Sequence, residues 1–249
     1  MNLVPLYFLT FDPMYWIMIG PALLLALYAQ ARVSSAFGKY KRVAASSGMT
    51  GAEAAAAMLR GEGITIVASP AQAKATDNAV AIVPTSGMLS DHYDPRAKVL
   101  RLSDEVYRGR SVASVGIACH EAGHALQDAH GYAPLELRNL MVPVAAFGSQ
   151  AAIWIILAGL ILKGIPQLLT VGIILFAVVV FFQLVTLPVE FNASTRAKGA
   201  LRQLGIVQGP DEERGVAKVL DAAALTYVAA AVSAIMTLLY FLMIAANRR

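Results

Sequence analysis

Residues 164–189 read GIPQLLTVGIILFAVVVFFQLVTLPV, a run that contains no charged side chain. A helix needs about 20 consecutive apolar residues to cross the hydrocarbon core of a bilayer, and this run is long enough to do so. Three further runs are also uncharged, at residues 15–31, 142–162 and 222–246. The sequence therefore predicts a mainly α, polytopic membrane protein with four transmembrane helices.

The overall composition agrees with this class of protein. Hydrophobic residues make up 57% of the 249 residues and charged residues only 14%, whereas about a quarter of a soluble protein is charged. The first run ends in Ala29-Gln30-Ala31, which resembles a cleavage site, but residues 1–14 contain no Lys or Arg. A signal peptide begins with a basic segment, so we expect an uncleaved anchor. The single cysteine, Cys119, excludes a disulfide framework within the chain and is expected to be a small core residue.

Basic residues predict the orientation in the membrane, because cytoplasmic loops carry an excess of Lys and Arg. One side has Lys163, Arg248 and Arg249. The other side, formed by the segment between the first two runs and the segment after the third, has Arg32, Lys39, Lys41, Arg42, Arg138, Arg196, Lys198 and Arg202. We expect this second side to be cytoplasmic. The asymmetry accounts for the net charge of +4, so no nucleic-acid partner is expected.

The large segment between the first two runs contains His120-Glu121-Ala122-Gly123-His124, the HExxH pattern. Two histidines four positions apart lie on one face of a helix, at a spacing that lets both bind one Zn²⁺. Glu121 then lies beside the metal, where its carboxylate can take a proton from a water that zinc makes more acidic. The uncharged residues 111–119 indicate a buried helix, in which unpaired His and Glu side chains are costly. The motif predicts a zinc-dependent hydrolase.

A catalytic zinc site needs a third protein ligand, and the sequence offers two candidates. His130 stands ten residues after His120, the spacing of HExxHxxGxxH, but Gln127 occupies the position where that pattern has a turn-forming glycine. Glu190 directly follows the uncharged run 164–189, on the same predicted side of the membrane as the motif. We favour Glu190 and keep His130 as the alternative.

Longer motifs surround these residues: LSDHYDPR at 89–96, VLRLS at 99–103, HEAGHA at 120–125, GYAPL at 131–135 and LPVEF at 187–191. Through them the chain resembles, over nearly its whole length, the bacterial YugP-like neutral zinc metallopeptidases. It is also similar to membrane gluzincins of the HtpX and CAAX prenyl protease type, which place HExxH on one helix and a glutamate ligand on a later one. The resemblance implies Zn²⁺ held by His120, His124 and Glu190, with Glu121 as general base, in the bacterial inner membrane.

The chain departs from the broader group in one position. That group carries an aspartate four residues after the glutamate ligand, where it supports a zinc-bound histidine; this chain has Ser194 there and Asn192 nearby. Either side chain can hydrogen-bond an imidazole, and Asp128 is a further candidate for this support.

We expect five segments. They are a transmembrane anchor at 1–32, a small α+β zincin-like domain with a short β-hairpin or sheet at 33–141, transmembrane helices two and three at 142–189, a ligand helix and loop at 190–221, and a fourth transmembrane helix with the C-terminus at 222–249. Within the second segment the patterns predict a capping box at Thr50-Gly51-Ala52-Glu53, strands at 64–67 and 79–83, a hairpin at 88–102, and a motif helix capped by Ser111.

The predicted activity is endopeptidase cleavage of a peptide or membrane-protein substrate at the surface of, or within, a lipid bilayer. The hairpin offers an edge strand to an extended substrate, and His92, Tyr93 or Arg96 could stabilise the oxyanion; we name His92 as the candidate. The alternative is a zinc-stabilised scaffold or pseudo-protease that acts by binding partners. Glu121 argues against it, because a structural zinc needs no adjacent base. The uncharged runs argue against a transporter.

Overall fold

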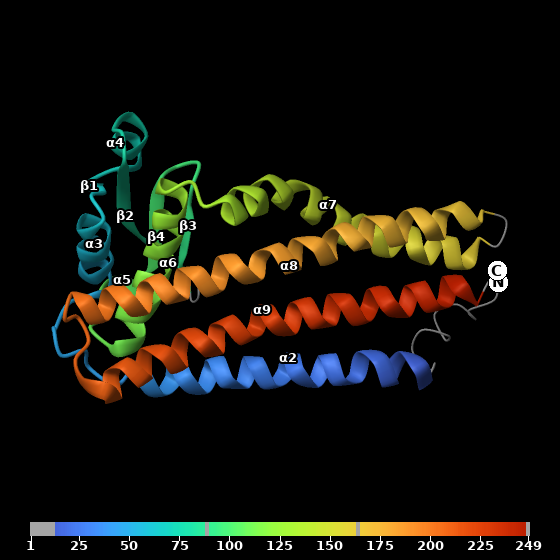
Figure 1. Ribbon diagram of the computed structural model, residues 1–249, viewed down its shortest axis with the longest axis horizontal. Coiled ribbons are helices and arrows are strands. Elements are labelled where there is room, and N and C mark those ends of the chain that lie inside the picture. Colours follow the sequence, from blue (N-terminus) through green and yellow to red (C-terminus); the bar gives the residue numbers. More distant parts are fainter. Residues whose placement is uncertain (1–12, 88–89, 163–164, 248–249) are drawn as a thin grey trace. The chain divides into compact units, whose positions relative to one another are not determined.

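The computed structural model describes residues 13–87, 90–162 and 165–247. Four of its helices are long and apolar enough to cross a membrane, and they occupy the four predicted runs (Figure 1): α2 (Pro13–Tyr40), α7 (Ala133–Ile161), α8 (Pro166–Gln203) and α9 (Gly209–Ala246). The mainly α, four-span fold class is therefore confirmed. Residues 1–12 of the expected anchor, residues 88–89 of the expected hairpin, and the basic residues Lys163, Arg248 and Arg249 lie outside the described residues.

Three of these helices continue through a proline. Pro21 lies inside α2, Pro143 inside α7 and Pro188 inside α8. A proline removes one backbone hydrogen bond from a helix, a loss that membrane helices tolerate. As a result the apolar run and Glu190 belong to one continuous helix.

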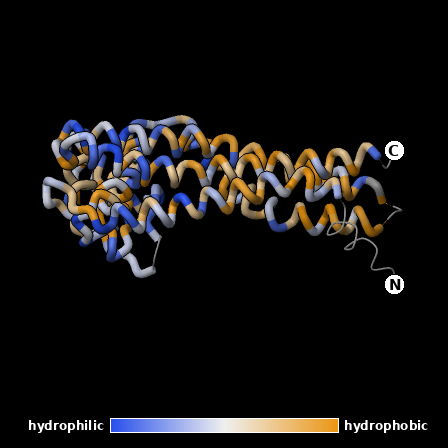
Figure 2. The backbone as a smooth tube through the Cα atoms, turned by 90° about the horizontal axis from the view of Figure 1, so that it is seen from below, coloured by the Kyte–Doolittle hydropathy of each residue, from blue (hydrophilic) through white to orange (hydrophobic). Residues whose placement is uncertain are grey.

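The chain divides into two compact units. The first consists of the described residues within Met1–Ala29, Leu137–Leu187 and Leu225–Arg249. Its inner cluster contains Ile156, Phe176 and Tyr240, while Trp154 on α7 is 73% exposed. Hydrophobic residues dominate these helical segments (Figure 2). Large apolar side chains directed outward are what a lipid environment requires, so this unit accounts for the membrane-spanning part of the protein.

The second unit comprises Gln30–Glu136 and Pro188–Ala224. Its sheet has the order β1 (Thr65–Val67), β2 (Ala79–Thr85), β4 (Val99–Ser103), β3 (His92–Asp94). The first three strands are parallel, and β3 pairs antiparallel with β4, with His92 opposite Arg101. The β3–β4 turn is fixed by the Asp94 carboxylate, which accepts hydrogen bonds from the backbone N–H groups of Arg96 and Ala97. The predicted hairpin is confirmed for its described residues, and β3 is an edge strand.

The helices that lie wholly within this unit are α3 (Gly51–Gly61), α4 (Pro70–Ala75), α5 (Asp104–Tyr107) and α6 (Val112–Ala129). The capping box between Thr50 and Glu53 is present at the start of α3, and Ser111 caps α6, as predicted. Helix α6 is the centre of the core, and its apolar residues pack with side chains from α3, the sheet, α8 and α9: Met58, Leu100, Leu201 and Leu220. The HExxH motif is therefore held on the most enclosed helix of the unit.

Candidate metal centre

The backbones of α6 and α8 approach closely beside the HExxH motif. A Cβ atom built on Gly123 would meet the carbonyl oxygen of Ala193 at 2.8 Å and its Cα at 3.1 Å. Real Cβ atoms do not tolerate such distances to backbone. The absence of a side chain at position 123 thus lets α6 lie directly against the turn of α8 that follows Glu190.

This approach brings together the two motif histidines and Glu190. Nε2 of His120 lies 3.2 Å from Oε2 of Glu190, and Nε2 of His124 lies 3.6 Å from the same oxygen. One potential ligand atom from each of the three residues lies within 4.8 Å of the other two. Glu190 is 1% exposed and His124 is 7% exposed. Two imidazoles and a carboxylate converge at the protein interior.

The ring of His120 is oriented by α8. Its Nδ1 lies 3.1 Å from the hydroxyl oxygen of Ser194, which stands one helical turn after Glu190. A partner at Nδ1 directs the other nitrogen toward the cluster, as partners of zinc-bound histidines do. Ser194 therefore lies where it can support the imidazole of His120.

The ring of His124 is oriented by Gln127. Nε2 of Gln127 donates to the backbone carbonyl of Val189 at 2.8 Å and to Oδ1 of Asn192 at 3.0 Å. These two acceptors fix the amide, so its Oε1, 2.9 Å from Nδ1 of His124, can only accept. Nδ1 of His124 therefore carries the hydrogen, and Nε2 presents its lone pair to the cluster. This is the tautomer that a metal ligand needs.

The donor set fits zinc. Two neutral imidazoles and one carboxylate are a common ligand set of catalytic zinc, which keeps a fourth position for water or substrate. Cys119 takes no part in this set, because it is fully buried in the core and burial raises the pKa of its thiol. Asp128, one of the candidates for supporting a histidine, instead accepts hydrogen bonds from the Tyr93 hydroxyl and the Lys98 ammonium, each at 2.7 Å. The hairpin therefore occupies the Asp128 carboxylate, and the support comes from Ser194 and Gln127.

Glu121 lies between the two histidines on α6. Burial raises the pKa of its carboxyl, and the negative charges of Glu190 and Asp91 act in the same direction, while His120 and His124 lower it. A carboxylate whose pKa is raised is a stronger base than one in water. Its environment suits a group that accepts a proton during a reaction.

The other candidate residues lie outside the cluster of three. His130 is the exposed C-cap residue of α6, and its Nδ1 lies 3.2 Å from a guanidinium nitrogen of Arg196. His92 is exposed on β3, with its Nδ1 2.7 Å from the carbonyl oxygen of Ser90. The Tyr93 hydroxyl is held by Asp128, and burial together with that bond raises its pKa.

Two residues important to this geometry were not predicted from sequence. Gln127 stood out only as a departure from a glycine pattern, although its spacing of three from His124 places both on one helix face. Gly123 lies inside the motif, where any small residue is acceptable by pattern. The roles of Gln127 and Gly123 become visible only in their contacts with α8.

The sequence was compared with protein families, curated proteins and solved structures. The family model described as "Putative neutral zinc metallopeptidase" matches residues 15–246. The chain therefore belongs to this family, as its sequence motifs indicated, and the zinc of the family fits the cluster of His120, His124 and Glu190. Among curated proteins it is similar to "Putative membrane protease YugP" of Bacillus subtilis (strain 168), with 48% identity over 228 residues, 92% of this chain and 95% of that protein. No solved structure matches the chain.

Gly123→Ala is expected to weaken zinc binding and lower the free energy of unfolding. The added methyl group would meet the Ala193 backbone, which cannot move aside as a flexible side chain can, and such overpacking costs about 1–3 kcal/mol. Thermal unfolding in detergent and zinc competition with a chelator measure the two effects. Gly199→Ala on α8 is the control, because a Cβ there meets nothing within 4 Å. Equal behaviour of the two variants would contradict the close approach of α6 and α8.

Gln127→Met is expected to weaken zinc binding about 10–100-fold, the usual effect of losing a residue that supports a ligand. Methionine has a similar size, but its thioether sulfur is only a weak acceptor for the hydrogen of His124 Nδ1, so the ring is freer to turn or to change tautomer. Chelator competition gives the affinity, and Gln208→Met at an exposed position is the matched control. An unchanged affinity in Gln127→Met would mean that the amide does not orient the imidazole.

Proposed function

We propose that the protein is a membrane-bound, zinc-dependent endopeptidase that cleaves peptide bonds of peptide or membrane-protein substrates. The convergence of His120, His124 and Glu190 within 4.8 Å carries this proposal. The family and the name of the Bacillus relative support it. The name and source of that relative support a location in the bacterial inner (plasma) membrane. The distribution of Lys and Arg supports a site on the cytoplasmic side.

The residues of the site have distinct tasks in this proposal. His120, His124 and Glu190 hold the metal, which when bound acts as a Lewis acid that polarises the scissile carbonyl and acidifies a water molecule. Ser194 and Gln127 keep the imidazole rings turned toward it. Glu121 takes a proton from the attacking water and passes it to the nitrogen of the leaving amine, since an amine leaves readily only when protonated.

The hairpin supplies the proposed contacts to the substrate. As an edge strand, β3 has backbone groups that can pair with an extended peptide. His92 is our candidate for a contact to the oxyanion. Because the carbonyl of Ser90 only accepts, Nδ1 carries the hydrogen of the neutral ring, and only the doubly protonated ring can donate from Nε2. The His92 contact would therefore act only with a cationic ring.

The proposal is tested with the full chain in detergent micelles and an unstructured protein such as casein as substrate. We expect new peptide termini in mass spectra of the zinc-loaded sample, loss of cleavage after a chelator removes the metal, and recovery when zinc is added back. A chain that binds one zinc per molecule and cleaves neither casein nor a broad peptide library would refute the peptidase function. It would favour the scaffold alternative.

A further inference from the structure

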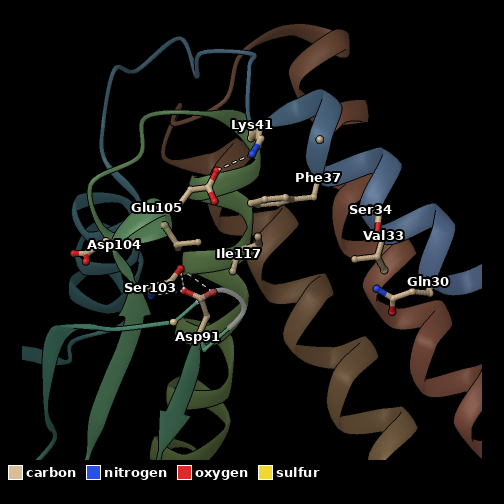
Figure 3. Close-up of a pocket in the computed structure, with 13 residues that line it drawn as sticks. Gln30, Val33, Ser34, Phe37, Lys41, Asp91, Ser103, Asp104, Glu105 and Ile117 are labelled. Atoms are coloured by element: carbon tan, nitrogen blue, oxygen red, sulfur yellow. Dashed lines mark hydrogen bonds and ion pairs between the residues drawn. The ribbon is translucent and has the colours of Figure 1, made fainter.

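A cavity of about 550 Å³ lies within the second unit (Figure 3). It is bordered by the last part of α2, by α5 and by Ile117 in the first half of α6. Its α2 wall is one helix face, in which Val33 and Phe37 extend toward Ile117 of α6. Val106 adds a further apolar side chain. The volume lies in the range of sites for small ligands or for parts of a peptide.

The cavity and the proposed zinc site lie on the same face of α6. Ile117 precedes His120 by three positions, Glu121 by four and His124 by seven, so all four side chains share one helix face. His120 and His124 lie about 4.5 and 10.5 Å along the helix axis from Ile117, whereas an extended peptide advances about 3.3 Å per residue. A substrate whose scissile carbonyl lies at the metal would therefore place a side chain in the cavity about one to three residues away.

The charged groups of the lining are already engaged. Lys41 pairs with Glu105 at 3.2 Å, and the carboxylate of Asp91 accepts hydrogen bonds from the N–H and the hydroxyl of Ser103 at 2.7 and 3.0 Å. Asp104 points away from the cavity (Figure 3) and lies 3.6 Å from Nε of Arg108. What remains for a ligand is the apolar surface between α2 and α6, together with the uncharged polar side chains of Gln30 and Ser34.

We infer that this cavity is a specificity pocket, which takes a large aliphatic or aromatic side chain of the substrate about one to three residues from the cleaved bond. The inference rests on the proposed peptidase function and adds a preference that the metal cluster alone does not imply. Helix α2 thereby acts as one wall of the substrate site as well as a membrane span. Asp91, which lines the pocket, immediately precedes edge strand β3. The substrate backbone could therefore pair with β3 while one of its side chains enters the pocket.

The test compares two adjacent substitutions on α2. Ser34 lines the pocket, while Ser35 is exposed and does not, so Ser34→Trp narrows the pocket and Ser35→Trp is its matched control. A peptide cleaved by the wild-type, zinc-loaded chain is resynthesised with Ala, Leu, Phe or Lys at each position flanking the cleaved bond. At one position we expect kcat/KM for Leu or Phe to exceed that for Ala at least about tenfold, as burial of several methylene groups gives. Ser34→Trp should lower this ratio at least tenfold, and Ser35→Trp should keep it.

Binding gives a readout that does not need catalysis. Fluorescence anisotropy of the same peptides on Glu121→Gln protein, with and without Ser34→Trp, should show a weaker preference for Leu and Phe only when position 34 is changed. Phe37→Ala, which enlarges the pocket, should shift the preference toward the larger side chain. If Ser34→Trp leaves the cleavage and binding preferences unchanged, or if the protein prefers Lys, the proposed role of the pocket is wrong. The proposed peptidase function is not affected by either result. If the wild-type, zinc-loaded chain binds these peptides selectively but cleaves none of them, the peptidase function is refuted and the binding pocket is retained.

Discussion

Glu190→Gln is expected to abolish zinc binding and, with it, peptide cleavage. The amide keeps the size of the side chain, so the packing around this 1% exposed position is preserved. However, it removes the negative charge and leaves a poor ligand beside two imidazoles. Loss of a supporting residue costs about 10–100-fold in metal affinity, and loss of a direct ligand should cost more than about 100-fold. Metal analysis after dialysis and chelator competition measure the change.

The alternative third ligand provides a reciprocal test. His130→Gln should leave zinc content and cleavage unchanged, because His130 is exposed and contacts Arg196. Glu62→Gln, at the exposed end of α3, controls for the loss of one negative charge. If zinc is retained in Glu190→Gln and lost in His130→Gln, the assignment of the ligands is wrong.

Glu121→Gln is expected to lower kcat about 10²–10⁴-fold, the contribution of a general base, with zinc content unchanged. The amide occupies the same space on α6 but cannot accept a proton. Burial, which raises the pKa of the Glu121 carboxyl, makes the lost group a better base than a solvent-exposed glutamate. Steady-state cleavage of a fluorogenic peptide and metal analysis of the same sample give both quantities.

The outcome of this substitution separates enzyme from scaffold. Cleavage at the wild-type rate in a Glu121→Gln protein that still holds zinc would exclude Glu121 as the base. A cellular function that survives Glu121→Gln but is lost in Glu190→Gln would support the zinc-stabilised scaffold. Glu62→Gln, which removes an exposed acid at the end of α3, controls for nonspecific effects of charge.

The sequence predicted those features that depend on composition and short spacing. Uncharged runs predicted the four long helices, and a serine before an apolar stretch predicted the start of α6. The hydrogen bond between Ser194 and His120 was foreseen as one possibility from the resemblance to membrane gluzincins, which implied a supporting side chain at this position.

Features that depend on packing between distant segments could not be predicted in this way. Proline usually disfavours helix in the residue before it, so Pro188 gave no sign that α8 continues. Asp128 lies one turn after His124, and nothing in its spacing reveals that Tyr93 and Lys98 of the hairpin bind it. The role of Gln127 requires the backbone carbonyl of Val189, which lies 62 positions along the chain.

The most direct test of the metal centre is diffraction from crystals of the zinc-loaded protein, with data collected on both sides of the zinc absorption edge. The difference map should contain one strong peak per chain, coordinated by Nε2 of His120, Nε2 of His124 and a carboxylate oxygen of Glu190. A peak coordinated by His130 in place of Glu190, or a peak away from α6 and α8, would contradict the metal centre on which the proposed function depends.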